Sequence, residues 1–201
     1  MSAAPLTQYT LAEYLDREET AVGKSEFYRG QIFAMSGGTP EHSEASVNIL
    51  TSLRGRLRGT PCRPYNSDLR IRIPANGLTT YPDVAVVCGE LQRDPLAITA
   101  INNPSVIFEV LSDSIESYDR GKKFGRYRQL ESLREYILVA QDEAHVERYV
   151  RQADDSWLLT VFKGLDAVVQ LTTLGCSLPL SEVYEDVTFP PSKPSPELVV
   201  A

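Results

Sequence analysis

Hydrophobic and polar positions alternate along this chain with two different periods, which predicts a mixture of strands and helices. Nearly uninterrupted apolar runs at 80–90 and 105–112 predict two buried strands. Apolar residues recur at helical spacing over 43–58 and 118–133, so we expect a helix at each place. The other expected elements are a short opening helix near 6–14, a hairpin at 24–36, a half-exposed strand at 62–74, a strand at 134–142 and a hairpin at 145–164. This order predicts an α/β fold, built as an α+β mixed sheet flanked by helices rather than as a fully parallel sheet.

Length and composition predict one hydrophobic core. With 201 residues, of which 42% are hydrophobic, the chain can fill a single core, and no linker interrupts residues 1–189. We therefore expect one domain there, followed by a Pro-rich, flexible tail at 190–201. No apolar run approaches the roughly 20 residues that span a membrane, and the N-terminus lacks the features of a secretory signal. We expect a cytoplasmic protein without a membrane partner.

The three cysteines of the chain are widely spaced. Cys62, Cys88 and Cys176 form no CxxC pair, and their number is odd. This pattern indicates neither a zinc site nor a disulfide framework. We therefore expect reduced thiols.

The net charge of −7 argues against a protein that coats nucleic acid nonspecifically, because such binding depends on clustered Lys and Arg. The charge is uneven, however, and basic residues concentrate in 54–72 and 120–134. The chain can therefore present one basic face. Solvated faces of ordinary helices and strands would give the same pattern.

Two acids interrupt strands that otherwise avoid charge. Asp83 begins one apolar run after Pro82, and Glu109 lies inside the other. A lone carboxylate in a buried strand costs several kcal/mol unless it is paired, hydrogen-bonded or bound to a metal. Either acid alone could face solvent or form a buried ion pair. If the two strands are neighbours, both carboxylates can converge at one edge of the sheet, which suits a hard divalent cation such as Mg²⁺.

The order of Pro82-Asp83, then Glu109, then a nearby lysine resembles the motif of the PD-(D/E)XK nuclease superfamily. The resemblance covers most of the chain and implies a restriction-endonuclease-like αβββαβ core with added β-hairpins. Four segments are similar, more closely, to a large bacterial family of restriction-endonuclease-like proteins that was formerly known only as a domain of unknown function. These segments are FYRGQIFAMSGGTPEHS, YPDVAVV, IFEVLSDSIESYDRGKKFGRY and REYILV.

The lysine of the motif is displaced in this chain. The superfamily pattern expects it two residues after Glu109, where Leu111 stands, and the related family carries a lysine in the following helix. Of the two candidates there, Lys123 falls within about 40° of the centre of the apolar stripe, whereas Lys122 points away from it. We choose Lys123 as the catalytic lysine. A surface lysine with an aliphatic stem on the core, paired with Asp119 four residues earlier, is the alternative.

The resemblance also implies a set of metal ligands. Asp83, Glu109 and the backbone carbonyl of Val110 would hold Mg²⁺, for which Mn²⁺ is the expected substitute. Three upstream residues could assist the site, although each could equally be a helix cap or a surface residue. They are Glu26 at the start of the first hairpin, His42 directly before the long helix and Glu44 just inside it.

The expected partner is DNA. The basic stretches would flank it, and we expect contacts from Arg70, Arg72, Arg120 and Lys122. Cutting both strands of a duplex requires two active sites, so we expect a homodimer.

Two functions from different classes remain open. The first is a Mg²⁺-dependent endonuclease that hydrolyses DNA phosphodiester bonds with Asp83, Glu109 and Lys123. The second is a catalytically weak protein that keeps the nuclease fold as a nucleic-acid- or protein-binding module, which the acidic net charge and Leu111 favour. An enzyme that acts on another phosphate ester is a third candidate, since the fold does not determine the substrate.

Overall fold

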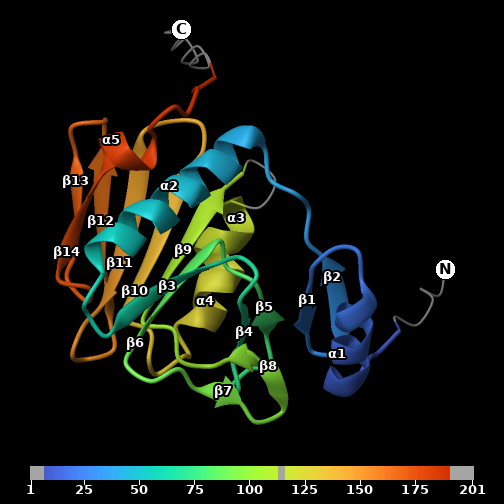
Figure 1. The fold of residues 1–201 in the computed structure, drawn as a ribbon. Coiled ribbons are helices and arrows are strands. Elements are labelled where there is room, and N and C mark those ends of the chain that lie inside the picture. Colours follow the sequence, from blue (N-terminus) through green and yellow to red (C-terminus); the bar gives the residue numbers. More distant parts are fainter. Residues whose placement is uncertain (1–6, 113–115, 191–201) are drawn as a thin grey trace, which may run out of the picture.

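A six-stranded mixed sheet lies at the centre of the computed structural model, which describes residues 7–112 and 116–190 (Figure 1). Its strand order is β12-β11-β10-β9-β6-β3. The two central strands, β9 and β10, run parallel, and every other neighbouring pair is antiparallel. The strands are β3 (Cys62–Asn66), β6 (Val84–Cys88), β9 (Val106–Leu111), β10 (Glu135–Ala140), β11 (His145–Arg151) and β12 (Trp157–Lys163).

A second sheet of six short strands lies beside the first and has the order β2-β1-β5-β4-β8-β7. Its strands are β1 (Ser25–Tyr28), β2 (Gln31–Ala34), β4 (Arg70–Arg72), β5 (Thr79–Thr80), β7 (Arg93–Asp94) and β8 (Ala97–Ile101). Ile71, Ile73 and Ile101 of this part pack into one hydrophobic cluster with Ile107 and Leu138 of the central sheet. The two sheets therefore share one hydrophobic cluster.

Helices cover the two faces of the central sheet. Helix α2 (Pro40–Arg56) crosses one face (Figure 1), and its Ile49 and Leu53 pack on alternate strand residues such as Phe108. The same face is completed by β13 (Val168–Leu171), β14 (Cys176–Pro179) and α5 (Leu180–Val183). The opposite face is covered by a broken helix. Its parts are α3 (Glu116–Tyr118), the π-helical segment η1 (Asp119–Lys123) and α4 (Phe124–Tyr127).

The order of elements that the sequence predicts is confirmed, and so is the mixed α+β class. Both hairpins form, with Arg29 and Gly30 at positive φ in the turn of the first, and both apolar runs are buried strands. The boundaries of two helices differ from the prediction. The opening helix α1 (Leu11–Thr20) starts later, because Thr10 and Glu13 form a capping box. Helix α2 starts earlier, at Pro40, because Thr39 caps it.

Two expected elements are divided. The strand at 62–74 becomes β3 and β4 in different sheets, because a turn closed by Leu69 N–H and Asn66 O separates them. The helix at 118–133 ends at Tyr127, and its apolar positions Leu130 and Leu133 are buried in turns instead. In both cases the periodic pattern identifies the buried residues correctly. It does not determine where the regular strand or helix ends.

The expectation of reduced thiols is wrong for two cysteines. Cys62 and Cys88 form a disulfide across 26 residues, while Cys176 is free as expected. The cause is the register of β3 and β6, which sets the two cysteines directly opposite each other. The spacing of the cysteines along the chain does not predict this disulfide.

Two other expectations concern the membrane and the tail. Across residues 7–112 and 116–190, no helix has the length and apolar character that a membrane crossing requires. The predicted tail at 190–201 lies outside the described residues apart from Pro190.

Candidate active site

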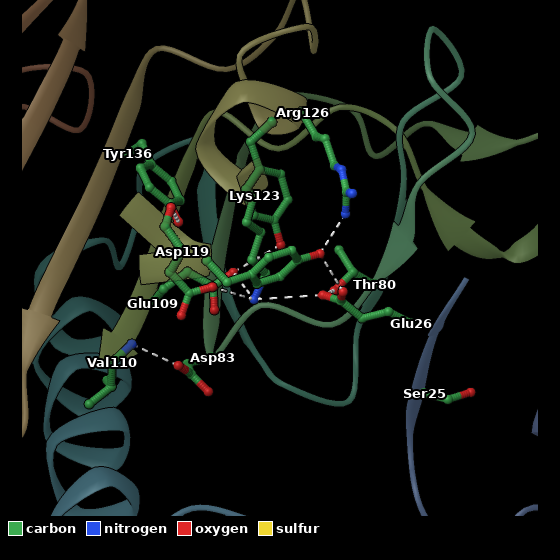
Figure 2. A network of polar contacts seen from close by, with 12 residues as sticks. Ser25, Glu26, Thr80, Asp83, Glu109, Val110, Asp119, Lys123, Arg126 and Tyr136 are labelled. Atoms are coloured by element: carbon green, nitrogen blue, oxygen red, sulfur yellow. Dashed lines mark hydrogen bonds and ion pairs between the residues drawn. The ribbon is translucent and has the colours of Figure 1, made fainter. Parts of the chain in front are cut away.

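Asp83 and Glu109 face each other from neighbouring strands. Strands β6 and β9 pair Val84 with Phe108, and continuing this antiparallel register by one residue sets Asp83 opposite Glu109. The backbone N–H of Val110 donates a hydrogen bond of 2.7 Å to Asp83 Oδ2 (Figure 2). The two strands are therefore neighbours, as the convergence of the two acids requires.

Alternation along β9 determines what Glu109 meets. It shares a face of the sheet with Ile107 and Leu111, and this is the face that the broken helix covers. Its side chain is 3% exposed, and Tyr127 donates a hydrogen bond of 2.9 Å to its Oε1. Leu111 lies on the same face with 5% exposure. A lysine at that position would point to the same side of the sheet as Glu109.

Lys123 supplies the positive charge beside Glu109. Its Nζ lies 2.9 Å from Glu109 Oε1, 3.2 Å from Asp119 Oδ1 and 3.8 Å from Glu26 Oε1 (Figure 2). The side chain is buried, whereas Lys122 is exposed. Lys123 points inward, as its helical phase predicts, and it also forms the ion pair with Asp119 that the surface-lysine alternative included. Both residues belong to the π-helical segment, an irregularity that is frequent at functional sites.

Glu26 closes the cluster from the second sheet. Its Oε1 accepts a hydrogen bond of 2.5 Å from Thr80, and its Oε2 accepts one of 2.7 Å from Tyr118. The Tyr118 hydroxyl in turn accepts a hydrogen bond of 2.5 Å from Arg126. The hairpin that carries Glu26 is thus tied to the broken helix through these polar contacts. Glu26 thus lies beside Lys123, and its role at the site stays a prediction.

Three carboxyl groups surround a single ammonium in this buried cluster. Burial raises the pKa of Glu109 well above its usual value, and the charges of Asp119 and Asp83 raise it further against the opposing effect of Lys123. Burial also raises the pKa of Asp119. The pKa of Lys123 would fall through burial alone, but Glu109, Asp119 and Glu26 raise it above its usual value. Lys123 is therefore fully charged at neutral pH.

His42 joins the other side of the site. It lies in the first turn of α2 rather than directly before the helix, and its Nε2 is 3.3 Å from Asp83 Oδ2. Burial lowers the pKa of His42, but its hydrogen bond to Asp83 and the charge of that carboxylate outweigh this, so the pKa is raised. Glu44 does not reach the site. It is exposed on the outer side of α2 and lines neither adjacent cavity.

The donor set fits a hard divalent cation. The described contacts engage Asp83 Oδ2 and Glu109 Oε1, which leaves the second oxygen of each carboxylate for a ligand. Both oxygens of Asp119 are buried, yet neither accepts a well-aligned hydrogen bond from a described residue. In the described part of the chain, no three His, Cys, Asp or Glu side chains already stand in a metal-holding group. Mg²⁺ commonly binds through only one or two carboxylates and keeps several waters, so the second oxygens of Asp83 and Glu109 are of the kind that it prefers.

The four expected DNA contacts divide into buried and exposed residues. Arg70 is 8% exposed and donates hydrogen bonds to Tyr81 and Thr99. Arg72 pairs with the buried Asp94 at 2.8 Å. These two arginines hold the second sheet together and do not present their charge to a ligand. Arg120 is half-buried between Glu116 and Glu147, and Lys122 alone is exposed without an ion pair to a described residue.

Four polar contacts of the site come from residues that the sequence analysis did not single out for function. They are Thr80, Tyr118, Arg126 and Tyr127, which bind the carboxylates or each other. Only the inward position of Tyr127 could have been predicted from the sequence, because it lies four residues after Lys123 on the same face of the expected helix. The others come from segments whose neighbourhood depends on the tertiary fold.

Two cavities open on either side of the cluster. One, of about 440 Å³, is lined by Glu26, Asp119 and Lys123 together with Phe33 and Met35. The other, of about 620 Å³, is lined by Asp83 and His42. Met35 and Ser36 line both cavities. The chain between β2 and α2 therefore separates two approaches to the same group of carboxylates.

Comparison with known proteins agrees with this architecture. Two uncharacterized proteins of Synechocystis sp. are 36% identical over 187 residues and 37% identical over 163 residues. These alignments cover 93% and 81% of this chain, and 97% and 92% of the relatives. The crystal structure of a putative nuclease belonging to DUF820 from Anabaena variabilis has the same fold, with a TM-score of 0.70 and 19% identity over 90% of this chain and 98% of that chain. Residues 11–181 match the model of the Uma2 family, described as "Putative restriction endonuclease". The chain therefore belongs to the Uma2 family of restriction-endonuclease-like proteins.

Proposed function

We propose that this protein is a metal-dependent endonuclease that hydrolyses DNA phosphodiester bonds at the cluster of Asp83, Glu109 and Lys123. One observation carries the proposal. Two carboxylates from adjacent strands face each other, and a buried lysine from the covering helix lies 2.9 Å from one of them. The family description and the fold of the DUF820 nuclease support the same class of reaction.

The chain's own residues have separable roles in this proposal. Asp83, Glu109 and the Val110 carbonyl would hold Mg²⁺, which supplies a Lewis acid for the phosphate and lowers the pKa of a bound water. The Val110 N–H and His42 fix the orientation of Asp83. Lys123 carries a permanent positive charge, which can stabilise the negative charge that develops on the phosphate.

Burying these ionisable groups costs folding free energy, which is hard to explain if the cluster has only a structural role. Glu109, Asp119 and Lys123 are nearly inaccessible to water, and three acids surround the single lysine. Removing charges from water costs several kcal/mol per ion, and hydrophobic residues would fill the same volume at lower cost. A divalent cation would balance the excess of negative charge. We take this excess as support for the metal and for a catalytic role.

A plasmid assay tests the proposal. Purified protein with Mg²⁺ or Mn²⁺ should nick or cut plasmid DNA, and Asp83→Ala should abolish the cutting. Glu44→Ala is the matched control, because it removes an exposed acid that lies outside both cavities and should leave the rate unchanged. Cutting that survives Asp83→Ala would contradict the assignment. DNA binding without any cutting by the wild type would favour a binding module that retains the nuclease fold.

The proposal extends to the setting of the reaction. Of the four expected DNA contacts, Lys122 is the exposed one that remains for the phosphate backbone. Two copies are required to cut both strands of a duplex, so double-strand cutting by this enzyme implies a homodimer. Sedimentation velocity with and without DNA would detect it. A role on genomic or foreign DNA would place the protein in the cytoplasm.

A further inference from the structure

We infer that the cavity beside Phe33 binds an unpaired nucleotide, so that the substrate is single-stranded or locally unpaired DNA. The inference rests on the proposed nuclease function and specifies its substrate. The cavity of about 440 Å³ has the size of a small-ligand pocket. Of the three proposed catalytic residues, Lys123 lines this cavity together with Glu26 and Asp119, whereas Asp83 lines the other cavity, so a nucleotide held here would lie beside Lys123.

Phe33 is placed by the first hairpin to line this cavity. It lies directly opposite Glu26 in the pairing of β1 and β2, so both side chains project from the same face of the hairpin. Glu26 is buried in the cluster, whereas Phe33 is 46% exposed. Met35 and the ring of Tyr118 line the cavity beside it. An exposed aromatic ring next to a buried charge cluster offers a stacking surface that the fold itself does not use.

The polar part of the cavity suits a nucleotide rather than an apolar ligand. Lys122 is exposed at the cavity and forms no ion pair with a described residue. Arg126 is held with its guanidinium 3.6 Å from the centre of the Tyr28 ring and donates to the Tyr118 hydroxyl. Basic side chains interleaved with aromatic rings are the pattern with which proteins bind single-stranded nucleic acid.

Burial of the cluster argues for an unpaired strand. Glu109 and Lys123 are 2% and 4% exposed, so a phosphate must enter a recess to approach them. A base-paired duplex is stiff and wide, so a nucleotide of a duplex must first leave its pairing to enter a cavity of this size. A nucleotide released from pairing can enter, and enzymes that act on recessed sites use single strands or extrude the target nucleotide.

Binding without metal tests the inference separately from cleavage. Fluorescence polarisation would compare a single-stranded oligonucleotide with the duplex of the same sequence, for wild type and Phe33→Ala. Base stacking contributes about 1–3 kcal/mol per base, so Phe33→Ala should weaken single-strand binding roughly 5–150-fold and change duplex binding little. Phe33→Trp keeps a ring and should retain the affinity. Leu159→Ala, which truncates a side chain with 45% exposure on the edge strand β12, is the control that should change neither.

The outcomes separate the two proposals. Equal affinity of wild type and Phe33→Ala for the single strand, or a loss in Phe33→Trp as large as in Phe33→Ala, would overturn the inference. If Asp83-dependent cutting persists in that case, the nuclease proposal stands without it. A Phe33-dependent preference for single strands in a protein that never cuts DNA would support the nucleotide cavity and refute the nuclease. Stronger wild-type binding to the duplex than to the single strand would also overturn the inference.

Discussion

Replacing Lys123 by methionine should destabilise the protein strongly in the absence of metal. The substitution keeps the length and the apolar stem of the side chain but removes its ammonium group. Among the described residues, this is the only ammonium in contact with Glu109, Asp119 and Glu26, at 2.9, 3.2 and 3.8 Å. Removing one partner of a buried ion pair costs about 3–5 kcal/mol, because the remaining charges are left uncompensated. For a protein of this size the melting temperature should fall by roughly 6–20 °C.

The neighbouring Lys122 provides the matched control. It is exposed and makes no ion pair with a described residue, so Lys122→Met should change the free energy of unfolding by no more than about 0.5 kcal/mol. Urea titrations at pH 7, followed by circular dichroism, give both values. Equal stabilities for Lys122→Met and Lys123→Met would show that the buried ammonium of Lys123 does not stabilise the fold.

The penalty in Lys123→Met should also depend on pH. The folded pKa values of Glu109 and Asp119 are already raised by burial, and Lys123 opposes this rise. Without the lysine these pKa values rise further. Carboxyls with raised folded pKa values stabilise the fold below the unfolded pKa of about 4, and this contribution is lost as the pH rises through the folded values. The penalty should therefore be smaller at pH 5 than at pH 7. A penalty that is the same at both values, or larger at pH 5, would contradict the account.

Three further predictions concern the fold and the metal. Arg70→Ala should lower the free energy of unfolding by about 1.5–3 kcal/mol through loss of its buried hydrogen bonds, with no change in the DNA affinity of the folded fraction; urea titration and polarisation measure the two effects, and lost affinity without lost stability would restore Arg70 as a DNA contact. Reduction of the disulfide between Cys62 and Cys88 should lower stability by about 3 kcal/mol, since it closes a loop of 26 residues; an unchanged urea midpoint in reducing buffer would contradict this. Because Glu109 has a raised pKa and must lose its proton to bind a cation, Mn²⁺ affinity should rise with pH through that pKa; isothermal titration between pH 5.5 and pH 8 measures it, and affinity independent of pH would exclude Glu109 as a ligand.

The catalytic candidates were predictable from sequence because each violates a local rule. Asp83 and Glu109 place charge in strands that are otherwise apolar, and such a violation needs a partner. Lys123 was separable from Lys122 because helical phase survives even where the helix is irregular, as it is in η1. The acids are local signals in the chain, whereas the resemblance to the nuclease family directed the search for the lysine to this helix.

Other features depend on contacts between distant segments. The pairing of Cys62 with Cys88 follows from strand register, and the burial of Arg70 follows from the second sheet. Its strand alternates like a half-exposed one, but Tyr81 and Thr99 cover the side that the pattern assigns to solvent. Alternation shows that the two faces of a strand lie in different environments. It does not report which of them another part of the chain will cover.

The central claim is that Asp83 and Glu109 jointly hold a divalent cation. A crystal soaked in Mn²⁺ and measured at the manganese absorption edge tests it most directly. Anomalous density is expected between the two carboxylates, about 2.1 Å from an oxygen of each as for Mg²⁺, with the Lys123 ammonium still beside Glu109. An occupied manganese position elsewhere, or no density between these carboxylates at millimolar Mn²⁺, would contradict it.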